Sequence, residues 1–95
     1  SDVPVLGLDA LESRYYLRVT VTDQPGVLAQ IAHVLGAQRV SIAAVNQKES
    51  DTGDGSAELV IMTHRARESA MRSAIEEIRA LPVVVQVSSF LRVEG

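Results

Sequence analysis

The first regular pattern along the chain is an alternation of apolar and polar residues over 15–22. Single polar residues separate Leu17, Val19 and Val21, which is the period of a strand with one buried face. Over 27–37 the period becomes helical, because apolar residues recur every three or four positions. The apolar positions of this helix are Leu28, Ile31, Ala32 and Leu35. The pattern therefore predicts a strand that is followed closely by an amphipathic helix.

The remaining chain repeats this order of elements. We expect a second strand over 40–49, a third over 57–63 and a second amphipathic helix over 65–80, which Pro82 ends. The turn cluster 50–56 is short enough to join the second and third strands as a hairpin. A last strand follows, and one of its faces is predicted to hold Val83, Val85, Val87 and Leu91. The order of elements is therefore β-α-β-β-α-β.

Two strand–helix–strand halves predict an α+β, ferredoxin-like βαββαβ fold. Right-handed crossovers leave room for one strand between each parallel pair, which gives a four-stranded antiparallel sheet with two helices on one face. Residues 14–95 are expected to form this domain, and 1–13 are expected to be an N-terminal tail. The apolar residues expected on the uncovered sheet face are Val45, Val60, Val84 and Phe90. An open apolar face and exposed sheet edges favour self-association.

Composition and charge exclude several classes of function. The 95 residues suffice for one domain, and no apolar run is long enough to span a membrane. Cysteine is absent, which excludes disulfides and thiolate metal sites and fits a cytoplasmic protein. The net charge of −3 is scattered along the chain, and two tyrosines and one phenylalanine offer little surface for stacking bases. We therefore expect neither a nucleic-acid nor a membrane partner.

The turn Asp23–Leu28, between the first strand and the first helix, is the main candidate site. Pro25 suits the first helical position, where its missing N–H costs nothing, and Gln24 would then be the last residue before the helix. One interpretation is an ordinary helix start, because Asp and Pro stabilise helix N-termini in many proteins without a ligand. The other interpretation is a binding site for a small anionic group such as an amino-acid carboxylate.

The residue types of this turn suit an α-amino acid. Gly26 lacks a Cβ, so a ligand can approach the backbone closely. In this interpretation the backbone N–H groups of Val27 and Leu28 would hold a carboxylate, and the carboxylate of Asp23 would attract an ammonium group. Together these groups would recognise both ends of the ligand.

Asn46 and Gln47 are the second candidate, late in the second strand. Both amides donate and accept hydrogen bonds, and they point to opposite faces of the strand, so only one is expected to reach a given site. The alternative is a solvated strand end. No catalytic residues are predicted, because no nucleophile–base set, paired carboxylates or phosphate loop occurs. His33 and His64 lack neighbours at ligand spacing, so no metal site is predicted.

Several segments resemble a known family. The turn Asp23-x-Pro-Gly-Val-Leu28, in this order of elements, resembles that of the ACT domain, a regulatory amino-acid-binding module. More narrowly, about 11–94 looks like the C-terminal ACT domain of bacterial homoserine dehydrogenase. The segments that match are Ser13–Val19, Asp23–Ala32, Ser41–Ala43, Gln47–Glu49 and Met62–His64.

The resemblance implies a regulatory fragment of an oxidoreductase. Homoserine dehydrogenases reduce aspartate semialdehyde to homoserine with NADPH or NADH, in threonine, methionine and isoleucine biosynthesis. The residues 1–13 would be the remnant of a linker to the absent catalytic region, so NADP or NAD would bind outside this fragment, which itself would hold no cofactor. Threonine is the expected effector, and the fragment is expected to form a homodimer through sheet edges and helices.

The resemblance also implies positions for the effector. In the family, ligands sit between two domains, so Asp23, Pro25, Gly26, Val27 and Leu28 would face the second strand of a partner chain. The residues that match amide positions of threonine-binding relatives are Asn46 and Gln47. Arg39 stands where many relatives have a glycine, so the end of the first helix is expected to differ.

Three alternatives remain open from the sequence. The fragment is a purely structural dimerisation module, or it is the ACT domain of another enzyme of amino-acid biosynthesis. The third alternative is a small enzyme on the same fold, such as an acylphosphatase-like hydrolase. Arg14 and Asn46 are the only hint of that activity, and the charge of Asp23 at the turn would repel a phosphate.

Overall fold

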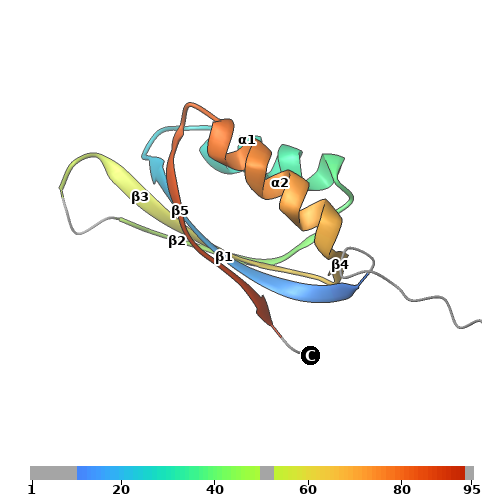
Figure 1. Cartoon of the computed structure of the whole chain (residues 1–95). Helices are drawn as coiled ribbons and strands as arrows, with labels where there is room; N and C mark the ends of the chain where they lie inside the picture. The colour runs from blue at the N-terminus through green and yellow to red at the C-terminus, as the bar shows by residue number, and fades with distance from the viewer. Residues whose placement is uncertain (1–10, 50–52, 94–95) are drawn as a thin grey trace, which may run out of the picture.

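The structure, a computed structural model, describes residues 11–49 and 53–93. It contains two helices and five strands in a two-layer arrangement (Figure 1). The elements are β1 (Glu12–Thr22), α1 (Val27–Ala37), β2 (Ile42–Glu49), β3 (Ser56–Thr63), β4 (Ala66–Arg67), α2 (Glu68–Ala80) and β5 (Val84–Val93). Both helices and all the long strands were predicted from the sequence.

The sheet has the order β2-β3-β1-β5, and all its neighbouring strands are antiparallel. Both helices pack on one face of it, as Figure 1 shows. The predicted ferredoxin-like βαββαβ fold is therefore confirmed. In the described part of the chain, neither helix is long and apolar enough to cross a membrane.

The core lies between the sheet and the two helices. Alternate residues of β1 and β3 are buried, whereas the helices bury residues at a spacing of three and four. The buried residues of β1 are Tyr15, Leu17, Val19 and Val21. Those of the helices are Val27, Ile31, Val34 and Leu35 in α1, and Met71, Ala74, Ile75 and Ile78 in α2. The sequence pattern thus marks the core of β1 correctly. In α1 it marks Ile31 and Leu35 correctly, but Leu28 and Ala32 are only partly buried, and Val27 and Val34 are buried instead.

The short strand β4 was not predicted. Residues 66–67 were expected in the second helix, but they pair with Glu12 and Ser13 of β1, and α2 begins only at Glu68. β3 and β4 pair with the same side of β1, one after the other. Tyr16 lies opposite Met62 and Ser13 lies opposite Ala66, so the segment between the two pairs has one residue more than the matching segment of β1. β1 therefore starts inside the segment predicted as a tail, of which residues 1–10 lie outside the described residues.

The last strand presents a different face to the core from the one predicted. Two irregularities in the pairing of β1 with β5 lengthen the spacing of its inward residues from two to three. Phe90, Val87 and Val84 lie opposite the buried residues of β1 and pack against the core. Val85 and Leu91 are 61% and 58% exposed. The prediction that Val85 and Leu91 share a face with Val87 is therefore wrong.

The apolar residues of the uncovered face differ from those predicted. Val84 and Phe90 are absent from it for the reason just given, and Val45 lies opposite the buried Ile61, which places it on the helix side. Of the predicted set only Val60, which lies opposite Arg18, is on the open face. Beside it the Arg18 Nε lies 3.6 Å from a Glu58 carboxylate oxygen.

Helix α1 ends in a compact turn at Arg39. The N–H of Val40 donates to the carbonyl of Leu35 and the N–H of Arg39 to that of Gly36, both at 2.9 Å. This is the Schellman arrangement, which requires a left-handed residue, and Arg39 has φ 63°. The helix thus ends in the geometry that a glycine normally supplies, at a conformational cost of about 1 kcal/mol for a residue with a side chain.

Candidate functional site

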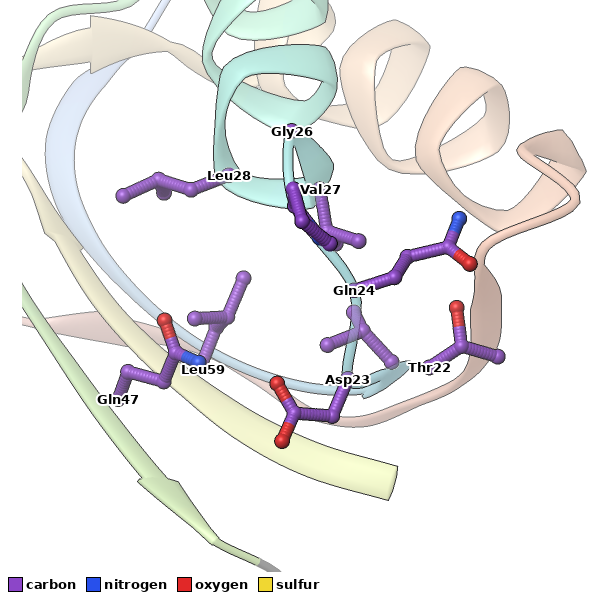
Figure 2. A pocket seen from close by; sticks show the side chains of 10 residues that line it. Thr22, Asp23, Gln24, Gly26, Val27, Leu28, Gln47 and Leu59 are labelled. Atoms are coloured by element: carbon purple, nitrogen blue, oxygen red, sulfur yellow. The ribbon is translucent and has the colours of Figure 1, made fainter. Parts of the chain in front are cut away.

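A hollow of about 340 Å³ lies between the β1–α1 turn and the strands β2 and β3 (Figure 2). It is on the helix side of the sheet and is open to solvent. Its lining residues are Val21, Thr22, Asp23, Gln24, Pro25, Gly26, Val27, Leu28, Gln47 and Leu59. All five residues predicted in the turn line this hollow, together with one of the two predicted amides.

Backbone hydrogen bonds hold the turn in place. The N–H of Asp23 donates to the carbonyl of Gly55 at 2.9 Å, which ties the turn to the residue before β3. The N–H of Gln24 donates to the carbonyl of Thr22 at 3.0 Å and bends the chain out of the strand. The wall of the hollow is therefore fixed to the sheet at the end of β1.

Helix α1 begins at Val27, where the helical period of the sequence begins. Pro25 lies in the turn, and the residue that precedes the helix is Gly26, with φ 85°. A left-handed residue cannot continue a right-handed helix, so the helix starts at Val27. The prediction of Pro25 at the first helical position is wrong. Gly26 is needed here for its positive φ, in addition to the close approach that its missing Cβ allows.

The first turn of α1 leaves backbone donors available to a ligand. The first helical hydrogen bond is donated by the N–H of Gln30 to the carbonyl of Gly26, at 3.1 Å. The N–H groups of Val27, Leu28 and Ala29 thus have no partner within the helix. No side chain caps this end, and no acidic residue lies in the first turn. The helix therefore presents uncompensated positive potential beside the hollow.

Polar side chains from two elements converge on the hollow. Figure 2 shows the carboxylate of Asp23 and the amide of Gln47 both turned toward it, with Leu28 and Leu59 beside them. In the described part of the chain the Asp23 carboxylate makes no hydrogen bond or ion pair, so it is available to a cation. The hollow thus combines one negative group, backbone donors, an amide and apolar surface.

The two amides of β2 lie on opposite sides of the sheet. Gln47 lies opposite Leu59, which is buried beneath the helices, and lines the hollow. Asn46 lies opposite Val60 on the open face and does not line it. Of the two predicted amides, Gln47 is the one that lines the hollow.

Four residues line the hollow without having been predicted as site residues: Val21, Thr22, Gln24 and Leu59. The first three are next to Asp23 or one residue further away, so their proximity followed from the turn itself. The position of Leu59 depends on the hairpin register, which sets it opposite Gln47.

The described residues offer little support for a metal site or for a hydrolase site at this turn. Among the described residues no three His, Cys, Asp or Glu side chains lie close enough together to hold a metal ion. Arg14, the basic residue considered for a hydrolase, donates from Nε to the carbonyl of Thr63 at 3.2 Å. It does not line the hollow at the turn.

Comparison with known proteins supports the fold and gives relatives. The model of the ACT domain family matches residues 15–83. The chain is 41% identical over 93 residues to a homoserine dehydrogenase from Methylobacillus glycogenes, covering 98% of this chain and 23% of that protein. It is 40% identical over 94 residues to the homoserine dehydrogenase of Pseudomonas aeruginosa, covering 99% and 22%. The chain thus spans about a fifth of the length of these relatives.

Solved structures give a consistent picture. A homoserine dehydrogenase from Thiobacillus denitrificans superposes with a TM-score of 0.84 at 34% identity, over 99% of this chain and 20% of that one. The ACT domain of a GTP pyrophosphokinase from Chlorobium tepidum superposes with a TM-score of 0.63 at 16% identity, covering 87% of this chain and all of that one. The second likeness concerns the fold alone.

Proposed function

The chain belongs to the ACT domain family, and on that basis we propose that it is the amino-acid-sensing regulatory domain of a homoserine dehydrogenase, with threonine as its effector. The parent enzyme would be an NAD(P)-dependent oxidoreductase whose catalytic and cofactor-binding residues lie outside this chain. The observation that carries the proposal is the hollow at the β1–α1 turn. It is lined by a carboxylate that has no partner among the described residues and by residues whose N–H groups have no partner within the helix.

The hollow matches the two charged ends of an amino acid. The N–H groups of Val27 and Leu28 would hold the ligand carboxylate, and the helix end adds about 0.3–1 kcal/mol of electrostatic attraction. Asp23 would hold the ammonium group by a charge-assisted hydrogen bond. The amide of Gln47 would bond to the threonine hydroxyl, while Leu28 and Leu59 supply apolar contact for its methyl group.

A second copy of the chain would complete the site. The hollow is open to solvent, and β2 is an edge strand whose residues from Ala44 to Glu49 are all exposed. An edge of this kind offers unpaired backbone groups to a partner. We therefore propose a homodimer in which the β2 edges and the α1 helices of two chains lie side by side and cover each hollow.

Titration calorimetry with L-threonine tests the effector. We expect saturable binding with one ligand per chain, and Gln47→Ala is expected to weaken it about tenfold, because one hydrogen bond of about 1.4 kcal/mol is lost. Asn46→Ala is the matched control, since it removes the neighbouring amide from the open face. An absence of heat with threonine, methionine and isoleucine at millimolar concentration would instead support the purely structural module.

Sedimentation velocity tests the dimer. We expect the chain to sediment as a dimer at micromolar concentration, with a larger dimer fraction when threonine is present, because a ligand bound by both chains favours their association. Val45→Lys places a charge on the helix side of the β2 edge and is expected to shift the chain toward the monomer. A monomer at several hundred micromolar, with or without threonine, contradicts the proposed assembly.

A further inference from the structure

A second hollow, of about 430 Å³, lies at the other end of β1. It is bordered by the start of β1, the end of α1, the strand β4 and the start of α2. Three arginines line it, Arg39, Arg65 and Arg67, against one acidic residue, Glu12. The whole chain has a net charge of −3, so this cluster is opposite in sign to the protein that holds it.

Each arginine is placed by a defined backbone feature. Arg39 is the left-handed residue that ends α1, and Arg67 is the extended residue that precedes α2. Arg65 donates from its guanidinium to the backbone carbonyl of Glu12 at 3.1 Å. The three side chains therefore come from two chain segments that the fold brings together.

Two of these guanidinium groups are uncompensated. Within residues 11–49 and 53–93, Arg39 and Arg67 make no hydrogen bond or ion pair through their side chains. Glu68, which directly follows Arg67, is already engaged, because its carboxylate accepts from Arg72 at 3.0 Å and from Arg92 at 2.6 Å. Its carboxylate also raises the pKa of Arg92. Glu68 is therefore committed to other cations.

The arrangement is electrostatically unfavourable for the protein alone. Arg65 and Arg67 precede the N-terminus of α2, where the helix dipole contributes positive potential, and Glu68 in the first turn of that helix is engaged by Arg72 and Arg92. Arg39 adds a third positive charge to the same hollow. A bound anion would relieve this repulsion.

We propose that this second hollow binds a phosphate group, either free or on a small organic molecule. Guanidinium groups match the oxygen geometry of phosphate through paired hydrogen bonds, and a dianion neutralises the two uncompensated charges. The volume exceeds that of a phosphate ion, so it has room for an attached organic group. The site is separate from the amino-acid hollow, which contacts the opposite end of β1.

Calorimetric titration with inorganic phosphate, and separately with glycerol 3-phosphate, tests this site at low and constant ionic strength. We expect saturable binding of one anion per chain, weakened at least fivefold by Arg39→Gln and by Arg67→Gln. The matched control is Arg79→Gln, which removes an exposed positive charge from the last turn of α2, away from the hollow. Tighter binding of glycerol 3-phosphate identifies an organic phosphate as the ligand, and equal binding identifies the phosphate group alone.

Two results would overturn the proposal. One is an absence of saturable binding at millimolar phosphate. The other is an equal loss in the Arg79→Gln control, which would show that only the overall charge matters. Circular dichroism confirms that each variant is folded, and all three side chains are exposed, so folding is not expected to suffer. Threonine titrations of the same variants separate this site from the proposed effector site, since they are expected to remain unchanged.

Discussion

Replacing Gly26 with Val is expected to reduce the affinity for threonine by at least tenfold. Gly26 has φ 85°, and a β-branched residue avoids this region, at a cost of about 1–2 kcal/mol. An added Cβ would meet no atom within 4 Å, so the effect comes from the backbone and not from a clash inside the chain. The strain displaces the N–H groups of Val27 and Leu28, which are the proposed carboxylate donors.

The chain supplies a matched control for this substitution. Gly36 lies inside α1, and a Cβ there also meets no atom within 4 Å, but its φ is outside the left-handed range. Gly36→Ala is therefore expected to leave threonine affinity unchanged and to add about 0.5–1 kcal/mol of stability. Gly26→Asn is expected to retain more affinity than Gly26→Val, because Asn tolerates the left-handed region. Calorimetry on the three variants decides the matter, and undiminished affinity in Gly26→Val would show that the turn is not the site.

Replacing Phe90 with Ala is expected to lower the free energy of unfolding by about 3 kcal/mol. The Phe90 ring stacks on the buried ring of Tyr15, with 5.4 Å between centroids and 26° between planes. It also lies opposite Leu17 on the helix side of the sheet. The substitution removes this aromatic contact and leaves a cavity at the edge of the core.

The neighbouring residue is the control. Leu91 is 58% exposed, so Leu91→Ala is expected to cost less than about 0.5 kcal/mol. Urea denaturation followed by circular dichroism measures both variants. The face predicted from the sequence requires the reverse order, with the larger loss at Leu91, and that order would contradict the bulged strand seen in the structure.

The contrast between β1 and β5 shows where sequence patterns suffice. β1 is paired on both sides, and strict alternation along it marks the buried residues correctly. In β5 two bulges place Val84, Val87 and Phe90 on one face at intervals of three. A bulge depends on how the partner strand pairs, and alternating valines in the sequence do not reveal it.

The candidate site, too, was predicted from the sequence in part. The turn at Asp23–Leu28 was identified from its residue types, and the structure brings these residues together around one hollow. The place of Pro25 was predicted wrongly because proline's fixed φ suits a turn as well as a first helical position. The choice between Asn46 and Gln47 required the hairpin register, which no residue type in the sequence determines.

The central strand β1 limits how a signal can leave this domain. Its 11 residues span about 34 Å, and its two ends contribute to the two separate hollows. A shift of one residue in the pairing of β1 would turn all its buried side chains to the open face. We therefore expect β1 to keep its register with β3 and β5. We therefore expect ligand binding at the Asp23 end to tilt the domain as one body. The tilt would reach the Glu12 end, where the backbone carbonyl of Leu11 accepts a hydrogen bond from the N–H of Glu68 at 3.0 Å.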